Sequence, residues 1–320
     1  MPDDLLRRRL ERLNRESLPA SAAPSSGAAA SATRRAEQPI AVSSQRVARP
    51  PVTHAAQAAG LLRSGEVVET PFGPHLRIDL PLEKLWQGGE KLIAARQEFL
   101  RTQLAAANQA VEPTIVMDAE FAAFVTALPD RTLALDLETC GLAGSALFLV
   151  GLLRQVGGVP AVQMLLARNY AEEAAVLASL WQTVAEHDVL LTFNGKTFDW
   201  PMVVERSVRH RLQPVGWASP TKRAAFDSEM VDGAHPMKVH IDILHHSRRR
   251  WKKQLPNCRL QTLERHICRR TRAADIPGHA IPAVYAEYVR TGIEREMDTV
   301  LYHNALDLVT LFDLAHRLAA

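Results

Sequence analysis

The stretch LALDLETC, residues 133–140, has the apolar pattern of a buried strand but contains two acids, Asp136 and Glu138. Side chains of a strand alternate between its two sides, so these carboxylates project from the same face, two residues apart. An unpaired carboxylate in an apolar surrounding is unfavourable and tends to take up a proton. Two such groups side by side need a cation nearby, although the motif alone fits a solvated strand end equally well.

The segments around this strand predict an α/β domain that begins near Pro113. Three strands in a meander are followed by helix, strand, helix, strand and further helices. The expected strands cover residues 132–139, 145–155, 159–167, 188–195 and 238–246, with helices at 171–187, from Thr197 onward and at 294–318. This is the order of the ribonuclease H-like fold, an α/β architecture in which helices flank both faces of a mixed sheet.

The expected domain covers residues 113–320. The residues before it divide into two segments. Residues 1–55 are rich in Ala, Ser, Pro and Arg, with little to bury, which predicts a disordered basic tail. Residues 56–112 predict a small β element, from a strand-like stretch at 67–80 with a Phe-Gly-Pro turn signal, and a helix at 89–108. Arginines near the start of the tail indicate contact with nucleic acid or a protein partner, or else a solvated charged helix.

The composition is that of a globular chain. Of its 320 residues, 47% are hydrophobic and 23% are charged, and the longest apolar run is far shorter than the roughly 20 residues of a membrane span. The N-terminus lacks the apolar core and cleavage site of a secretory signal, so the expected location is cytoplasmic, with no membrane partner. Three cysteines without a CxxC pair indicate reduced thiols. A net charge of +3 is too small by itself to indicate a polyanionic partner.

A further acid follows a later strand. In LLTFNGKTFDWP, residues 190–201, Asp199 comes after a short apolar strand and a turn, at the expected start of a helix. The helix dipole favours an acid there without any function, so helix capping is the alternative. Asn194 and Lys196 in the same turn are candidates for binding the substrate backbone, and a purely structural role is equally open for each.

A third group lies in LYHNALDLVTL, residues 301–311. His303 and Asp307 are four residues apart and share one face of a helix, either as a satisfied buried pair or facing the strand acids. Carboxylates from the first strand, the strand-helix turn and the last helix can surround two hard divalent cations, Mg²⁺ or Mn²⁺. Two such ions hold the attacking and leaving oxygens of a phosphodiester displacement. His303 would orient or deprotonate the attacking water.

Five motifs in this order resemble the YprB-type ribonuclease H-like domain, a branch of the DEDD exonuclease superfamily. They are D-L-E-T, F-N-G-K-x-F-D-x-P, H-I-D-I-L-H with the basic segment after it, D-I-P-G-x-x-I-P and H-N-x-x-D, and they span roughly residues 113–320. The resemblance implies that Asp136, Glu138, Asp199 and Asp307 bind two metal ions. It also implies that the activity is removal of nucleotides from a 3′ end.

The sequence departs from that superfamily just before the last acid. Its members carry His five residues before this acid or Tyr four before it, whereas this chain has His303 four before Asp307 and Tyr302 five before. His303 is the preferred water activator because its type and position suit the role. Tyr302 is the alternative.

Positive charge concentrates between residues 245 and 272, with ten basic residues against one acid. The basic residues are Arg248, Arg249, Arg250, Lys252, Lys253, Arg259, Arg265, Arg269, Arg270 and Arg272, and the acid is Glu264. Such a run with an interleaved tryptophan predicts a groove that follows phosphates and stacks a base. The candidate substrate-binding residues are Arg248, Arg249, Trp251 and Lys252. The alternatives are a solvated helix face and, for Trp251, a core anchor.

Three other features are expected to be structural or stay open. Asp242, in the last expected strand, is a possible fifth acid but resembles a strand residue outside the metal set. The His and Cys residues near it do not have the spacing of a zinc finger. Residues 215–237 form a long polar loop, either a flap over substrate or an insertion.

The sequence thus predicts a metal-dependent nuclease, in first place a 3′–5′ exonuclease acting on single-stranded nucleic acid or a 3′ end, with two Mg²⁺ or Mn²⁺ ions. The rivals are a non-catalytic nucleic-acid-binding module on the same fold and a structure-specific endonuclease. The motifs do not distinguish DNA from RNA, because recognition of the 2′-hydroxyl depends on the shape of the pocket.

Overall fold

The computed structural model describes Ala58 and residues 60–109, 117–141, 144–212, 237–272 and 275–320. The expected tail, residues 1–55, and residues 215–236 of the expected polar loop lie outside the described residues. All described residues belong to one unit of the chain, Pro51–Ala320.

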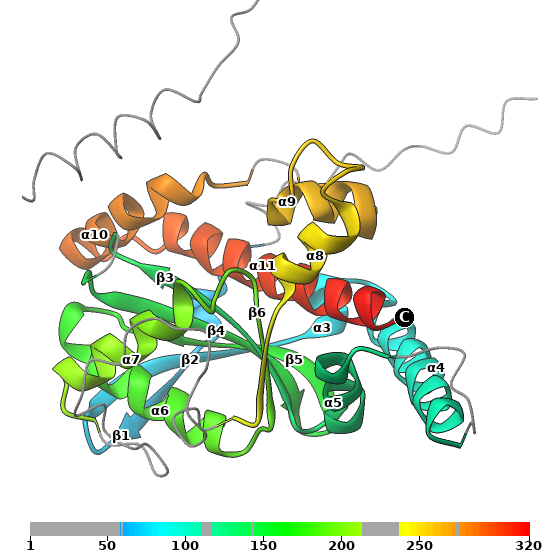
Figure 1. Cartoon of the computed structure of the whole chain (residues 1–320). Coiled ribbons are helices and arrows are strands. Elements are labelled where there is room, and N and C mark those ends of the chain that lie inside the picture. Colours follow the sequence, from blue (N-terminus) through cyan, green and yellow to red (C-terminus); the bar gives the residue numbers. More distant parts are fainter. Residues whose placement is uncertain (1–57, 59, 110–116, 142–143, 213–236, 273–274) are drawn as a thin grey trace, which may run out of the picture. The chain divides into compact units, whose positions relative to one another are not determined.

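Within these residues, seven strands form one mixed sheet in the order β1-β2-β5-β4-β3-β6-β7 (Figure 1). The strands are β1 (Glu66–Thr70), β2 (Gly73–Pro81), β3 (Thr132–Thr139), β4 (Leu147–Val156), β5 (Val159–Leu166), β6 (Val189–Thr192) and β7 (Val239–Asp242). β3, β4 and β5 are an antiparallel meander, and Gly157 and Gly158, both at positive φ, make the tight turn between β4 and β5. β6 pairs parallel with both β3 and β7. The predicted mixed sheet is confirmed.

The N-terminal hairpin belongs to the same sheet. β1 and β2 pair antiparallel around the turn at residues 71–72, and β2 then pairs antiparallel with β5. The β element and the helix expected in this part of the chain are present as β1–β2 and as α4 (Gly89–Gln109). β1 and β2 therefore extend the sheet formed by β3 to β7 at one edge.

Helices cover both faces of the sheet (Figure 1). On one face, α11 (Arg295–Ala319) contacts β3, β4, β5 and β6; on the other, α6 (Glu173–Ala185) contacts β2, β4 and β5 and packs on α7 (Asp199–Arg209). Further helices are α3 (Leu82–Leu85), α5 (Ala119–Ala127), α8 (Ile243–Trp251), α9 (Leu260–Leu263) and α10 (Ile281–Thr291). No helix in the described part of the chain is long and apolar enough to cross a membrane.

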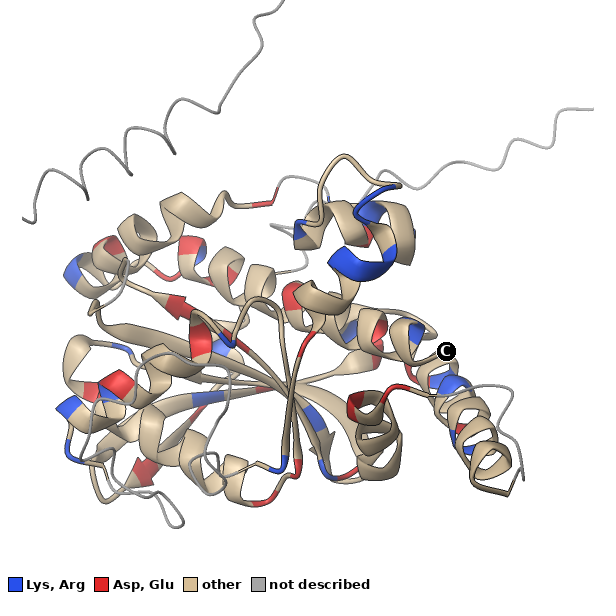
Figure 2. Ribbon diagram, viewed as in Figure 1, with Lys and Arg blue, Asp and Glu red and all other residues tan. Residues whose placement is uncertain are grey.

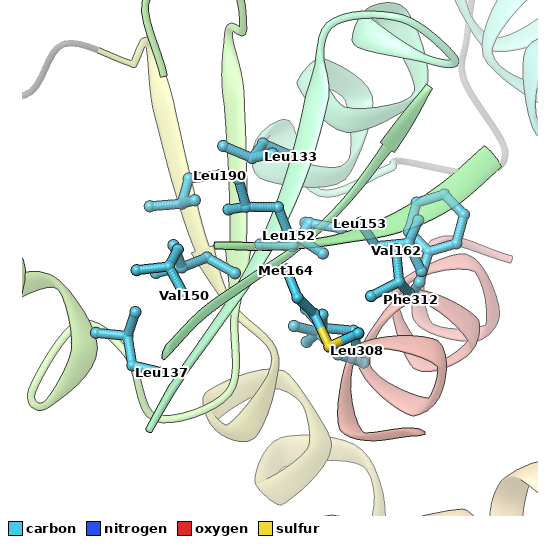
Figure 3. Close-up of a cluster of buried hydrophobic side chains, with 14 of the residues drawn as sticks. Leu133, Leu137, Val150, Leu152, Leu153, Val162, Met164, Leu190, Leu308 and Phe312 are labelled. Carbon is cyan, nitrogen blue, oxygen red and sulfur yellow. The ribbon is translucent and has the colours of Figure 1, made fainter. Parts of the chain in front are cut away.

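The hydrophobic core fixes α11 against the sheet. Figure 3 shows Leu308 and Phe312 of α11 beside Val162 and Met164 of β5, and all four side chains are buried. Burial of a side chain of this size contributes about 1.5–3 kcal/mol. Most residues of α11 are buried, so this helix presents its polar side chains at fixed positions relative to the strands.

The last strand is shorter than expected. The sequence predicted a strand over residues 238–246, but β7 ends at Asp242 and α8 begins at the next residue. The Asp242 carboxylate accepts a hydrogen bond from Leu244 N at 3.1 Å and so caps α8. This cap overrides the apolar composition that suggested a longer strand.

Candidate active site

Strand β3 presents its two acids on one face. Asp136 and Glu138 are partly exposed, whereas the neighbouring Leu135 and Leu137 are buried. In the ladder with β4, Asp136 stands opposite Gly151. The observed alternation agrees with the strand pattern of the sequence and places both acids on one side of the sheet.

Helix α11 approaches the sheet so closely that only glycine fits at one position. A Cβ atom on Gly151 would lie 1.8 Å from Asn304 Oδ1 and 2.8 Å from Leu308 Cδ1. Because Gly151 is opposite Asp136, Asn304 reaches that acid and donates a hydrogen bond from Nδ2 to Asp136 Oδ2 at 2.8 Å. Gly151 therefore sets the distance between the strand acids and the residues of α11.

Asp199 is the first residue of α7 and is 5% exposed. In the turn before it, Asn194 has a φ of 67°, and a Cβ on Gly195 would lie 2.3 Å from Thr192 Cβ. Asn194 thus takes the left-handed conformation, and Gly195 allows the close approach of the chain to Thr192. Burial, with the negative charge of Asp242, raises the pKa of Asp199 to about 7.

Asp307 and His303 lie one turn apart on α11, with His303 Nε2 3.5 Å from Asp307 Oδ2. The other ring nitrogen of His303, Nδ1, is 2.7 Å from Asp275 Oδ1. The buried Arg272 brings Nη2 to 2.5 Å from Asp307 Oδ1, but within the described structure neither atom has a hydrogen-bond partner of good geometry. Burial opposes protonation of His303, yet the hydrogen bond to Asp275 and the charge of Asp307 outweigh it and raise the pKa of His303.

The four predicted acids lie close enough to act on one another. Burial raises the pKa of Asp136 well above its usual range, and the negative charges of Asp307, Glu138 and Asp199 raise it further. Burial, followed by the charges of Asp307 and Asp199, has the same effect on Glu138. Both side chains keep an exposed edge, but protein surrounds their carboxylates. A cation among these groups would relieve their repulsion.

The chemistry of the site fits a hard divalent cation. The predicted ligands supply only carboxylate oxygens, which such cations prefer. However, no group of three or more His, Cys, Asp or Glu side chains in the described residues is arranged to hold a metal ion. In this structure Arg272 supplies the positive charge next to Asp307.

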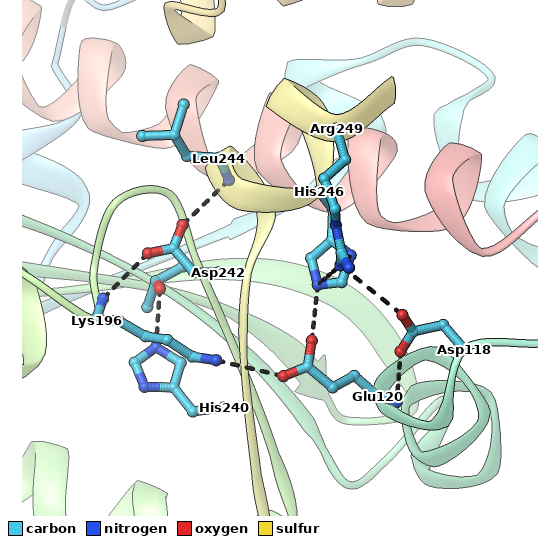
Figure 4. A network of polar contacts seen from close by, with 9 residues as sticks. Asp118, Glu120, Lys196, His240, Asp242, Leu244, His246 and Arg249 are labelled. Carbon is cyan, nitrogen blue, oxygen red and sulfur yellow. Dashed lines mark hydrogen bonds and ion pairs between the residues drawn. The ribbon is translucent and has the colours of Figure 1, made fainter. Parts of the chain in front are cut away.

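The turn residues expected to bind substrate make contacts within the protein (Figure 4). Asp242 accepts hydrogen bonds from Asn194 N at 2.9 Å and from Lys196 N at 3.2 Å, so it is a structural acid that holds this turn. Lys196 Nζ lies 3.3 Å from Glu120 Oε1. The hydrogen bond from His246 to Glu120, at 2.7 Å, holds the pKa of that carboxyl at about 2.

A cavity of about 470 Å³ lies beside the same turn. It is lined by Asp118, Glu120, Lys196, Asp242, His245, His246 and Arg249. The four predicted metal ligands are not in its lining, and its acids offset its cations. The cavity is therefore separate from the carboxylates of β3 and α11.

The basic side chains of α8 and the residues after it are exposed, but the tryptophan is not. Arg248, Arg249 and Lys252 are exposed, and Figure 2 shows basic residues along this segment. Trp251 is 8% exposed and packs in the hydrophobic core. The prediction that Trp251 stacks a base is therefore corrected, and the alternative of a core anchor holds. The guanidinium of Arg250 lies 5.8 Å from the centroid of its ring.

Part of the basic run serves internal ion pairs. Arg270 Nη1 lies 3.0 Å from the buried Asp313, and Arg272 Nε lies 2.7 Å from Glu264 Oε2. These arginines balance buried acids and do not form part of an open cationic surface. Tyr302, the alternative water activator, is 7% exposed and packs in a small cluster with Ala58 and Leu306.

Three polar residues that contact the predicted site were not expected from the sequence: Asn304, Asp275 and Arg272. A lone glycine inside an apolar strand, Gly151, signals a close approach and could have pointed to Asn304. Asp275 stands in the D-I-P-G motif, and Arg272 was counted only as a member of the basic run. Contacts of these two residues with α11 depend on tertiary packing.

Comparison with known proteins agrees with this fold. A model of the RNase H superfamily matches residues 133–319. The uncharacterized protein YprB of Bacillus subtilis (strain 168) is 31% identical over 186 residues, a match that covers 56% of this chain and 40% of YprB, so the chain spans less than half of that relative. The family B DNA polymerase of the hyperthermophilic archaeon Pyrobaculum calidifontis aligns with a TM-score of 0.46 and 12% identity, over 79% of this chain and 45% of the polymerase. The resemblance to YprB-type proteins is confirmed, and the chain belongs to the RNase H superfamily.

Proposed function

We propose that the protein is a metal-dependent nuclease, in first place a 3′–5′ exonuclease that hydrolyses phosphodiester bonds of DNA or RNA. The observation that carries the proposal is the pair Asp136 and Glu138 on one face of β3, near enough to Asp199 and Asp307 for the charges of those two acids to raise the pKa of both. Ionised carboxylates that repel one another in a protein surrounding destabilise the fold unless a cation or a proton neutralises them, and a cation keeps them ionised. Membership of the RNase H superfamily supports the same reading.

The residues of the site have separate tasks in this proposal. The four carboxylates would hold two Mg²⁺ or Mn²⁺ ions, which supply positive charge for the attacking and leaving oxygens. Asn304 orients Asp136 through the 2.8 Å hydrogen bond to Oδ2. His303 Nε2, on the side of the ring that faces Asp307, would take a proton from the attacking water.

Exposed cations near the acids favour a polyanionic substrate. Arg248, Arg249, Arg250 and Lys252 are exposed on α8 and just after it, and α8 packs against α11, the helix that carries Asp307 (Figure 2). A nucleic-acid strand following these cations would be led toward the carboxylates. Binding of an oligonucleotide should therefore weaken as salt rises, because contacts with phosphates release counterions.

Hydrolysis of a labelled single-stranded oligonucleotide by the full chain tests the proposal. We expect nucleotides to be released from the 3′ end with Mg²⁺ or Mn²⁺ and none in EDTA. The double variant Asp136→Asn, Glu138→Gln should be inactive, and without metal it should melt at a higher temperature because the repulsion is gone. Glu98→Gln, which removes an exposed acid on α4, is the matched control. Hydrolysis by the double variant would refute the assignment.

A nucleic-acid-binding module without catalysis is the second candidate, and the 2.5 Å contact of Arg272 with Asp307 favours it. Calorimetric titration with Mn²⁺ separates the two, since a module without a metal site should give no heat of binding. A structure-specific endonuclease with the same acids is a further variant of the first candidate. It would cut a circular single strand, which an exonuclease leaves intact.

A further inference from the structure

The imidazole of His303 lies between two carboxylates. Its Nδ1 is 2.7 Å from Asp275 Oδ1, and its Nε2 is 3.5 Å from Asp307 Oδ2. The ring is nearly enclosed, with the side chain 8% exposed. Asp275 is not one of the four predicted metal ligands, so the two nitrogens of the ring face carboxylates with different tasks.

Asp275 is itself held in place by its second oxygen. Oδ2 accepts a hydrogen bond from Gln261 Nε2 at 3.0 Å and another from Arg272 Nη1 at 3.2 Å. Arg272 is in turn fixed by Glu264 at 2.7 Å, and the side chains of both residues are only 5% exposed. Rotation of the Asp275 carboxylate would break these contacts, so Oδ1 stays directed at His303.

This arrangement selects one tautomer of His303. An ionised carboxylate only accepts hydrogen bonds, and of the two carboxylates Asp275 is the one at hydrogen-bond distance, 2.7 Å against 3.5 Å for Asp307, so the nitrogen that faces Asp275 carries the hydrogen. In the neutral ring the lone pair then resides on Nε2, the nitrogen that faces Asp307. A carboxylate on the far nitrogen is a general device for fixing the orientation and tautomer of a working histidine.

We propose that Asp275 is a positioning residue that fixes the Nδ1–H tautomer of His303 and thereby directs the proton acceptor at the carboxylate site. The catalytic consequence rests on the proposed nuclease function, whereas the tautomer is a property of the metal-free protein. If Asp275 only stabilised the chain around Gln261 and Arg272, its replacement would leave the tautomer of His303 unchanged.

Nitrogen NMR of the full chain, labelled with ¹⁵N-histidine and free of metal, tests this directly. At a pH where the ring is neutral, the protonated and unprotonated nitrogens have distinct shifts, and His303→Gln identifies the signals of His303. We expect Nδ1–H alone in the wild type and in Asp275→Glu, and a mixed or reversed tautomer in Asp275→Asn, whose amide can donate to Nδ1. Glu287→Gln, at an exposed ion pair with Arg290 on α10, is the matched control: it lies outside this network of contacts, so it should keep the wild-type signals.

Activity supplies the second readout. With Mn²⁺, Asp275→Asn should lower kcat by about 10²-fold or more, the usual contribution of a positioned base, with KM little changed. Glu287→Gln should stay near the wild type in both kcat and KM. Asp275→Ser, which also removes the carboxylate, replaces the Asn variant if melting curves show that the latter does not fold.

The outcomes separate the two proposals. An unchanged His303 tautomer in the folded Asn or Ser variant overturns the positioning role, whatever the activity. If the wild-type chain hydrolyses no oligonucleotide, the nuclease function fails, and the NMR measurement still decides the role of Asp275. A changed tautomer with unchanged kcat would overturn the catalytic consequence.

Discussion

Replacing Gly151 with alanine tests the close packing on which the geometry of the site depends. The added Cβ would lie 1.8 Å from Asn304 Oδ1 and 2.8 Å from both Asn304 Cγ and Leu308 Cδ1. Relief requires Asn304 to rotate and lose its 2.8 Å hydrogen bond to Asp136, or α11 to move off the sheet. A shift of α11 is costly because most of that helix is buried.

The expected loss of stability follows from three contributions. Overpacking of a core costs about 1–3 kcal/mol, and loss of the hydrogen bond to Asp136 costs about 1 kcal/mol more. The lower freedom of the unfolded chain offsets about 0.4–1 kcal/mol. Gly151→Ala should therefore lower the free energy of unfolding by about 1–4 kcal/mol, with the melting temperature falling roughly 2–4 °C for each kcal/mol.

Thermal and denaturant unfolding measure this change. Gly278→Ala is the matched control, since a Cβ at Gly278 meets no described atom within 4 Å. Asn304→Ala, added to Gly151→Ala, removes two of the three close contacts, so the double variant should be more stable than additivity predicts, by about 0.5–3 kcal/mol. A Gly151→Ala protein as stable as the wild type would refute the close approach of α11 and the orientation of Asp136 by Asn304.

Three further predictions concern charged groups. Arg206→Met removes the arginine that lies 2.5 Å from the buried Glu173 and leaves that carboxylate with His210 and Leu147 N as its remaining partners. The loss should cost up to about 3–5 kcal/mol in denaturant unfolding, whereas Arg131→Met at an exposed ion pair should cost at most about 1 kcal/mol. Burial lowers the pKa of His316 to about 4, below its ordinary 6.5, so the unfolded state binds the proton first as the pH falls. The free energy of unfolding should therefore fall by up to about 3 kcal/mol between the ordinary pKa and the lowered one. The fall should be smaller in His316→Gln, and an equal dependence of stability on pH in the two proteins would contradict the prediction. Because the pKa of Asp199 is raised to about 7, Mn²⁺ binding at about pH 6 should release protons. In calorimetry the heat of binding should then depend on the ionisation enthalpy of the buffer, and a heat that is the same in all buffers would contradict this.

Most secondary structure of the sheet could be predicted from the sequence, because alternation and turn residues are local signals. β3, β4 and β5 follow their apolar runs, and the Gly157–Gly158 turn lies where expected. The error at β7 arose where a local cap competes with an apolar run: Asp242 binds Leu244 N, and the chain becomes helical at Ile243. A side chain that bonds the backbone two residues on is hard to recognise from composition alone.

The polar contacts of the candidate site were less predictable. The spacing of His303 and Asp307 shows that they share a helix face, but nothing in the spacing shows that Asp275, 28 residues earlier, would bind the ring. Trp251 lies in a basic run that favours a surface position, yet it is buried, because the face of α8 opposite the arginines packs on the core. Contacts of this kind depend on how helices pack, and the residues carry no local signal for them.

The distribution of charge favours a site for cations over a site built for stability. Asp136, Glu138 and Asp199 have raised pKa values because they are buried close to other acids, and the guanidinium of Arg272 is directed at Asp307. A chain selected for stability alone would pair these carboxylates or replace them with apolar residues. The cations on α8 are exposed and so leave the inner carboxylates without compensation. Close-set acids inside and exposed cations outside would suit the metal ion and the polyanion of the proposed function, since each would neutralise charge that the protein balances only in part.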